Sequence, residues 1–145
     1  MYHLEDFRIL EKALIDIKDY EYLLYYPYIR QCFDGNGFDC WSLIHHIYQM
    51  NDIELPTYVL GGWSVRKTQK QIESKVSDWK SVEYEDRRFL DVILFNTSRK
   101  LSTHVGVTLN PKYYIHANID INIAIEKFTS GFQSSRINRI YRWQQ

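Results

Sequence analysis

The sequence has no excess of charge of either sign. Lys and Arg together number 18, as do Asp and Glu, so the formal net charge is +0 at pH 7. A neutral chain produces no overall field that would attract a polyanion. We therefore predict neither nucleic acid nor an anionic membrane surface as a partner.

A long apolar run is also lacking at the start of the chain. The opening residues, MYHLEDFRILEKALIDIKDY, place acids and bases among the apolar positions, which neither a secretion signal nor a membrane span tolerates. We expect synthesis and folding in a cytoplasm, with no segment in a membrane. A length of 145 residues is the usual size of one domain, so we predict a single domain over residues 1–145.

Cysteine is scarce. Only Cys32 and Cys40 are present, and without a secretion signal two cysteines favour thiols over a disulfide. Cys32 is more readily explained as incidental than as a resolving thiol. His45 and His46 follow Cys40, but the sequence offers no second ligand pair at zinc spacing. We predict no metal and no other cofactor.

The first half of the chain has helical patterns and one turn-rich segment. Apolar residues recur at intervals of three and four over residues 5–24, which predicts an amphipathic helix. Residues 34–37 form a turn-rich Asp-Gly-Asn-Gly segment that leads to Asp39. Asp39 is a good N-cap for a helix through WSLIHHIYQM. A weaker pattern predicts a surface helix over residues 64–79.

The second half consists of short β-branched or aromatic runs separated by turn residues, a pattern typical of strands. Helices followed by strands predict an α+β fold, with N-terminal helices packed on a C-terminal antiparallel sheet. We expect Asp91 to end a strand, and Arg136, Arg139 and Arg142 to lie on a solvated strand edge. The predicted strands are FLDVILF, THVGVTLN, YYIHANI, INIAIEKF and RINRIYRW.

Cys40 would begin the helix that Asp39 caps. The partial positive charge at a helix N-terminus stabilises a thiolate, and unpaired amides of the first turn can stabilise an oxyanion on an attacked carbonyl. Cys40 is therefore a candidate nucleophile, with an expected pKa below that of an ordinary thiol. The alternative for a single cysteine is a packing role in the core.

Two histidines provide a candidate base and its partner. His104 opens one predicted strand and His116 lies in the next. A hairpin loop of residues 109–111 would place them directly opposite each other, whereas a loop of residues 110–112 would leave them diagonal neighbours on one face. In either register one ring could orient the other, as nucleophilic catalysis by a thiol requires. The alternative is that both are half-buried polar residues of a sheet.

Several short motifs resemble those of a known family. GFDCW at residues 37–41 resembles the nucleophile segment of the NlpC-type cysteine peptidases. HVGV at residues 104–107 and YIHA at residues 114–117 resemble the two histidine segments of that family. Tyr28, twelve residues before the cysteine, matches a tyrosine that often contributes to the oxyanion site. The resemblance covers roughly residues 25–117.

The resemblance implies a papain-like α+β fold without a metal. It implies hydrolysis of an amide bond in the peptidoglycan stem peptide, typically the γ-D-glutamyl bond to meso-diaminopimelate or lysine. By the same resemblance Cys40 is the nucleophile and His104 the general base and acid. His116 would orient His104, and Tyr28 would donate to the oxyanion.

The chain departs from many secreted members of the family. Trp41 and Ser42 follow the nucleophile where those members have serine and glycine, which resembles tail-associated peptidases of long-tailed phages. Leu90 and Asp91 replace a frequent Gly-Asp, and the stretch between cysteine and first histidine is longer. We expect an enzyme of a phage or prophage tail, located in the virion tail or delivered to the cell wall by a larger machine, with tail proteins as further partners. The alternatives are a tail assembly component with little activity and an exported antibacterial effector.

Overall fold

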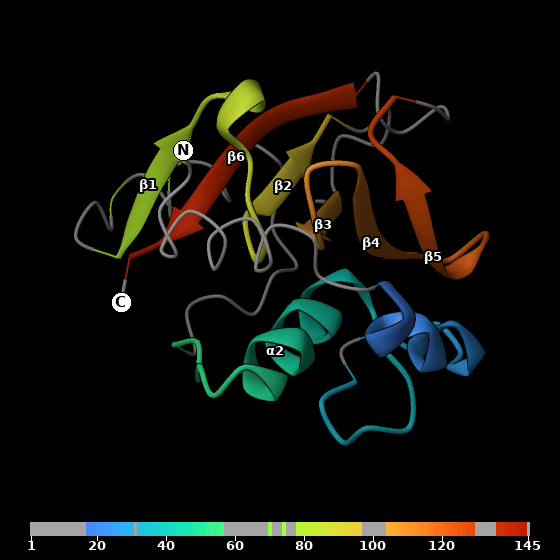
Figure 1. The fold of residues 1–145 in the computed structure, drawn as a ribbon. Coiled ribbons are helices and arrows are strands. Elements are labelled where there is room, and N and C mark those ends of the chain that lie inside the picture. Colours follow the sequence, from blue (N-terminus) through green and yellow to red (C-terminus); the bar gives the residue numbers. More distant parts are fainter. Residues whose placement is uncertain are drawn as a thin grey trace, which may run out of the picture.

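One antiparallel sheet contains the strands found among the described residues (Figure 1). The computed structural model describes residues 17–30, 32–56, 70, 74, 78–96, 104–129 and 136–144. Within these residues the sheet has six strands in the order β1-β6-β2-β3-β4-β5, and all neighbours are antiparallel. The strands are β1 (Trp79–Val82), β2 (Val92–Phe95), β3 (His104–Thr108), β4 (Tyr113–Asn118), β5 (Asn122–Lys127) and β6 (Ile137–Trp143).

Two helical segments precede the sheet and lie on one side of it (Figure 1). The first, η1 (Ile17–Tyr25), is a 3-10 helix, and the second, α2 (Cys40–Met50), is an α-helix. Among the described residues, no helix is long and apolar enough to cross a membrane. Helices before an antiparallel sheet confirm the predicted α+β fold.

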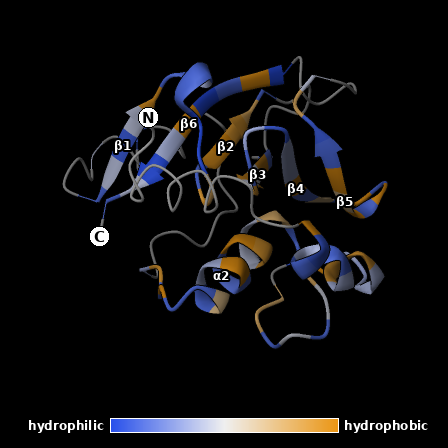
Figure 2. Ribbon diagram, viewed as in Figure 1, coloured by the Kyte–Doolittle hydropathy of each residue, from blue (hydrophilic) through white to orange (hydrophobic). Residues whose placement is uncertain are grey.

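The two faces of the sheet bury separate apolar clusters because side chains alternate along each strand. The face toward α2 contributes Val92, Leu94, Val105 and Val107 to a core that also contains α2 and η1 residues. Figure 2 shows the corresponding hydrophobic positions of α2 turned toward the sheet. The opposite face holds a smaller cluster, whose buried members are Ile93, Phe95, Tyr114, Phe128 and Ile140.

The structure confirms α2 and the five predicted strands, and it corrects the helix type of one prediction and the last residue of another. The described part of the helix predicted over residues 5–24 is 3-10 rather than α, and it ends before Pro27. The helix predicted over residues 64–79 lies largely outside the described residues. Its last residue, Trp79, instead begins β1, where it pairs with Trp143 and the two ring centroids lie 5.1 Å apart. A strand of four residues is too short to show a period of its own.

The prediction of a solvated strand edge at the arginines was wrong. β6 lies between β1 and β2, so it is paired on both sides. Arg139 points to solvent, but the guanidinium of Arg142 makes two hydrogen bonds to Asp91, at 2.9 and 2.8 Å. Asp91 does stand at a strand end, directly before β2, as predicted. Spacing along one strand could not reveal its partner across the sheet.

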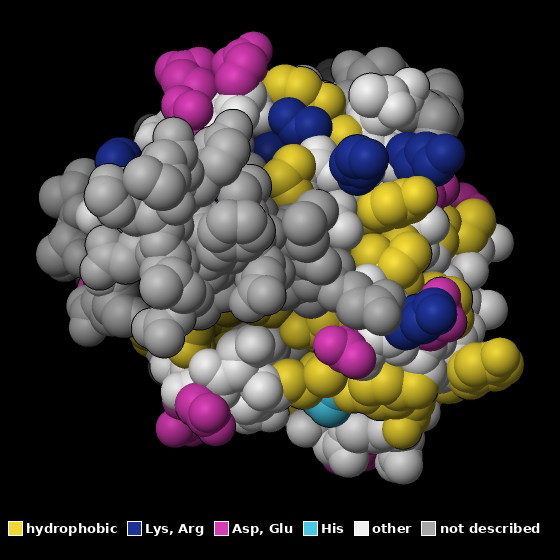
Figure 3. Space-filling model, in the orientation of Figure 1, with side chains coloured by type: hydrophobic (Ala, Val, Ile, Leu, Met, Phe, Trp, Pro, Cys, Tyr) yellow, Lys and Arg dark blue, Asp and Glu magenta, His cyan; other side chains and the backbone are white. Residues whose placement is uncertain are grey.

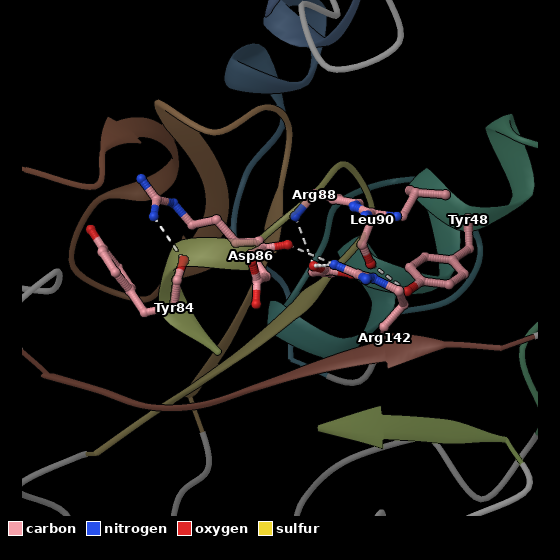
Figure 4. Close-up of polar contacts among 8 residues, drawn as sticks. Tyr48, Tyr84, Asp86, Arg88, Leu90 and Arg142 are labelled. Carbon is pink, nitrogen blue, oxygen red and sulfur yellow. Dashed lines mark hydrogen bonds and ion pairs between the residues drawn. The ribbon is translucent and has the colours of Figure 1, made fainter. Parts of the chain in front are cut away.

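Polar contacts near Asp91 join α2 to the sheet (Figure 4). The hydroxyl of Tyr48, on α2, donates to the carbonyl of Leu90. Arg142 also donates to the carbonyl of Asp86, in the short 3-10 helix η2 (Tyr84–Asp86), at 2.8 Å. Because Leu90 directly precedes Asp91, α2 is held to the segment that the ion pair fixes in place.

Candidate active site

Cys40 is the first residue of α2, as its sequence position predicts. The carboxylate of Asp39 accepts the backbone N–H of Ser42 at 2.9 Å, and the Ser42 hydroxyl accepts the N–H of Asp39 at 2.9 Å. These reciprocal bonds form a capping box that fixes the start of the helix. Ser42 therefore has a structural role beside Cys40.

The thiol of Cys40 lies against β3 where the pairing of β3 with β4 ends. The N–H of Leu109 donates to the carbonyl of Tyr113 on the neighbouring strand, so the N–H of Val105, four residues earlier, also points toward β4. The paired register includes Gly106 but not Val105. The backbone of Val105 instead hydrogen-bonds to the sulfur of Cys40. The thiol thus adjoins the residue that follows His104.

His104 and His116 meet across β3 and β4. Gly106 pairs with His116, so the hairpin has the second of the two predicted registers and the histidines are diagonal neighbours on one face. Their Nε2 and Nδ1 atoms are 2.8 Å apart. Both imidazoles are buried, with His104 8% exposed and His116 0%. One ring can therefore orient the other, as the pattern predicted.

Gly106 leaves room for this contact. A Cβ at position 106 would lie 3.1 Å from the carbonyl oxygen of Ile115, 3.2 Å from the Phe95 ring and 3.3 Å from the Cβ of His116. Such a side chain would press on the strand and ring that line the two imidazoles. The glycine of the HVGV motif is thereby explained by close packing.

The polar chain extends beyond the two histidines to a residue that the sequence did not identify. Glu126, on β5, lies diagonal to His116 and directly opposite Tyr114 in the register of β4 and β5. Its Oε2 atom is 2.9 Å from His116 Nε2 and accepts the Tyr114 hydroxyl at 3.0 Å. Once the β4–β5 hairpin is placed, strand alternation puts an acid on the histidine face, and only that pairing could have identified Glu126.

Burial controls the ionisation of these groups. It raises the pKa of Cys40 to about 12, with a smaller contribution from the charge of Asp39 and against opposing backbone hydrogen bonds. Burial also lowers the pKa of His104 to about 3, aided by His116, and that of His116 to about 4. The expected low pKa of Cys40 was wrong, because loss of solvation outweighs the helix N-terminus. At neutral pH, burial therefore keeps the Cys40 thiol and both imidazoles uncharged.

Tyr28 lies on the loop that precedes α2. Phe38 N–H donates to Pro27 O at 3.0 Å and Ile29 N–H donates to Phe38 O at 3.2 Å, so the loop folds back along the start of the helix. Burial raises the pKa of Tyr28, and the charges of Cys40 and Asp39 raise it further. The hydroxyl is therefore protonated at neutral pH, and Tyr28 packs against the core cluster that contains Cys40.

Gly37 permits this fold of the loop. A Cβ at position 37 would lie 2.6 Å from side-chain atoms of Ile29 and 2.7 Å from the carbonyl oxygen of Pro27. The backbone contact is the decisive one, because a carbonyl cannot rotate away as a side chain can. The first residue of the GFDCW motif thus allows the Tyr28 segment to approach the nucleophile.

The remaining candidate residues, Cys32, His45 and His46, make contacts elsewhere and do not join the polar contacts of His104, His116 and Glu126. The Cys32 thiol donates to Asp34 at 3.0 Å. The His45 ring packs edge-on against Phe33, and His46 lies 2.9 Å from the Tyr22 hydroxyl. Within the described segments, no three His, Cys, Asp or Glu side chains are grouped to hold a metal ion.

Comparison with known proteins identifies the family of the chain. The profile of the NlpC/P60 family matches residues 26–142, most of the chain. The chain belongs to the NlpC/P60 family. Cell-wall peptidase activity is what membership suggests, since NlpC/P60 proteins are typically cysteine peptidases or amidases. No curated protein matches the chain.

Solved structures of NlpC/P60 proteins share the fold. An NlpC/P60 family protein from Bacillus cereus is 22% identical, with a TM-score of 0.60 over 81% of this chain and 35% of that one. A lipoprotein-like NLP/P60 protein from Staphylococcus aureus is 18% identical, with a TM-score of 0.61 over 91% of this chain and 41% of that one. NlpC2 from Trichomonas vaginalis is 19% identical, with a TM-score of 0.60 over 92% and 50%.

These similarities confirm the predicted papain-like fold. This chain spans between 35% and 50% of the length of those three proteins. The catalytic roles of Cys40, His104, His116 and Tyr28 stay predictions.

Proposed function

We propose that this NlpC/P60 domain is a cysteine endopeptidase that hydrolyses an amide bond of the peptidoglycan stem peptide. The bond is the γ-D-glutamyl bond to diaminopimelate or lysine. The observation that supports this most directly is the 2.8 Å contact between His104 and His116. His104 directly precedes Val105 on β3, and the backbone of Val105 hydrogen-bonds to the Cys40 sulfur at the start of α2.

In the first step Cys40 attacks the carbonyl carbon of the scissile amide. His104 removes the thiol proton as the carbon–sulfur bond forms, because a thiol with a pKa of about 12 is not ionised in advance. The imidazolium then gives that proton to the leaving amine as the carbon–nitrogen bond breaks. A thioester on Cys40 and a free amino group result.

In the second step water hydrolyses the thioester. His104 takes one proton from the water as its oxygen attacks the carbonyl, and returns the proton to the departing sulfur. The products are a carboxylic acid and the original thiol. His116 holds the ring of His104 in place through both steps.

Tyr28 is proposed to stabilise the oxyanion of both tetrahedral intermediates. Its raised pKa keeps the phenol protonated, so it can donate a hydrogen bond to the developing charge. The N-terminal amides of α2 act in the same direction. A buried site strengthens these interactions because water does not screen them.

Incubation with purified muropeptides tests the proposal. Mass analysis should detect two products from cleavage at a single amide bond, whose masses add up to the mass of the substrate plus one water. Cys40→Ala should give none of these products, and Cys32→Ser should give all of them. Intact muropeptides with the wild-type chain would refute the proposal.

We also propose that a phage tail or a similar machine delivers this domain to the cell wall. The support is the Trp41-Ser42 pair, which resembles that of tail-associated peptidases. Detection of the chain in purified tail particles would support this delivery route, and its exclusive recovery outside such particles would contradict it.

A further inference from the structure

Residues of β3, β4 and β5 form a linear series of polar contacts that begins at His104. His104 Nε2 is 2.8 Å from His116 Nδ1, and His116 Nε2 is 2.9 Å from Glu126 Oε2. The same oxygen of Glu126 accepts the Tyr114 hydroxyl at 3.0 Å. His116 is fully buried, whereas the Glu126 side chain is 31% exposed. The chain therefore runs from the buried site to the surface of β5.

The direction of each hydrogen bond follows from the residue at the outer end of the series, Glu126. Because Glu126 Oε2 is an acceptor, His116 must carry its proton on Nε2 in order to donate to it. A neutral His116 then has an unprotonated Nδ1, which can only accept. His104 must accordingly carry its proton on Nε2 to complete the contact.

We propose that Glu126 is a positioning residue that fixes the tautomers of both histidines and leaves His104 Nδ1 unprotonated, so that this atom can accept the thiol proton. The inference rests on the proposed function, in which His104 is the base. With the opposite tautomers, His104 would carry a proton on Nδ1 and could not accept another from Cys40. Glu126 thus selects the form of the relay that can start the reaction.

Tyr114 fixes Glu126 in turn. Its hydroxyl donates to the same oxygen that His116 contacts, so that oxygen is held between two donors. Glu126→Gln can present its carbonyl oxygen to both donors and should preserve the tautomers. Glu126→Ala removes the acceptor and should release them.

Side-chain nitrogen NMR of the full chain measures the tautomers directly. Two-bond proton–nitrogen spectra of uniformly labelled protein distinguish a proton on Nε2 from one on Nδ1, and His104→Gln and His116→Gln assign the signals. We expect Nε2-protonated rings for both histidines in the wild type and in Glu126→Gln. Glu126→Ala should give mixed tautomers, while Lys127→Ala on the same strand should leave the spectrum unchanged. Wild-type tautomers in folded Glu126→Ala would overturn the proposal.

Turnover on muropeptides provides the second measurement. Loss of an orienting group can cost up to about 10⁴-fold, and we expect a drop of about 10- to 100-fold for Glu126→Ala, one contact further out. Glu126→Gln should stay within about threefold of the wild type, because the acceptor is restored. A Gln variant as impaired as the Ala variant would overturn the proposal. If the wild type cleaves no muropeptide, the proposed function fails while the NMR result still decides the role of Glu126.

Discussion

Two buried polar clusters on the same sheet differ in their ionisation. At the β6 side, Asp91 is 1% exposed and receives two hydrogen bonds from the Arg142 guanidinium and one from the Arg88 backbone, at 2.7 Å. At the β3–β4 side, His104 and His116 are buried with pKa values lowered to about 3 and about 4. The first cluster keeps an ion pair, and the second keeps its imidazoles neutral.

The difference indicates which cluster can perform chemistry. A carboxylate held by a bidentate guanidinium is fixed in one geometry and has no proton to exchange. Neutral imidazoles in series have both a lone pair and a proton, so they can accept and pass on a proton. We infer that the Asp91 cluster holds α2 in place and that the histidine cluster exchanges a proton with Cys40, the first residue of α2.

Removal of the nucleophile should produce the largest effect. Cys40→Ala should abolish muropeptide hydrolysis, and adding His104→Ala should cost almost nothing more, because a base without its nucleophile has no proton to remove. Urea unfolding should show that Cys40→Ala remains folded. A further large loss in the double variant would contradict the shared step.

Removal of the ion pair between Arg142 and Asp91 should lower stability rather than activity. Arg142→Met keeps much of the side-chain volume but leaves a carboxylate that is 1% exposed without its cation. The free energy of unfolding should fall by about 3 kcal/mol. Arg139→Met, on the same strand with an exposed side chain, should change it by less than about 0.5 kcal/mol. Equal effects of the two substitutions would show that the Asp91 pair contributes nothing specific.

Much of this comparison could be predicted from sequence, because local patterns specify local structure. Asp39 signalled the start of α2, and the two histidine runs with a turn between them signalled a hairpin with two allowed registers. Partners brought together by long-range pairing gave no such signal. Arg142 and Asp91 are 51 positions apart, and Glu126 reaches His116 only after β4 and β5 have paired.

The ionisation of Cys40 was not predictable from sequence for a different reason. The helix N-terminus is visible in the sequence, but the depth of burial depends on how α2 packs against β3. Position within a helix therefore gave the correct place and the wrong pKa direction.

Loss of the Tyr28 hydroxyl should weaken the chemical step alone. Tyr28→Phe removes one donor from the developing oxyanion, and turnover should fall by about 10²- to 10³-fold with little change in KM. Steady-state kinetics on a muropeptide substrate measures both values. Tyr25→Phe is the matched control, because Tyr25 is a neighbouring tyrosine that is 90% exposed. It belongs to η1, which lies at the lower right of Figure 1, where Figure 3 shows hydrophobic side chains at the surface. Unchanged turnover in Tyr28→Phe would remove Tyr28 from the site and leave the histidine cluster unaffected.

Thiol reactivity should show whether Cys40, next to the neutral histidine cluster, is itself a neutral thiol. Because the pKa of Cys40 is raised to about 12, the thiolate fraction should rise about tenfold per pH unit, and so should the alkylation rate between pH 7 and 9. Iodoacetamide kinetics measures this rate. The reaction should disappear in Cys40→Ser and persist in Cys32→Ser. A rate that reaches its plateau below pH 8 would instead indicate a preformed thiolate and imidazolium.

The neutral histidines should also make the stability of the protein depend on pH. Each has a pKa of 6.5 in the unfolded chain and a lower one when folded, about 3 for His104 and about 4 for His116. Between these values the unfolded state binds more protons, so stability is full above pH 6.5 and is lost as the pH falls toward 4. At pH 5 the loss should be about 2 kcal/mol per histidine.

Urea unfolding at pH 7.5 and pH 5 measures this loss, and His116→Gln isolates its source. Glutamine keeps a polar side chain but does not titrate, so the variant should lose less stability on acidification than the wild type. Part of the slope should remain, because His104 still titrates and burial also lowers the pKa of His46. The Asp91 cluster offers the contrast: in Arg142→Met the whole stability curve should be lower, yet its histidine-dependent slope between pH 7.5 and 5 should match the wild type. Identical slopes in the wild type and His116→Gln would mean that His116 is not held neutral, and the distinction between the two clusters would fail.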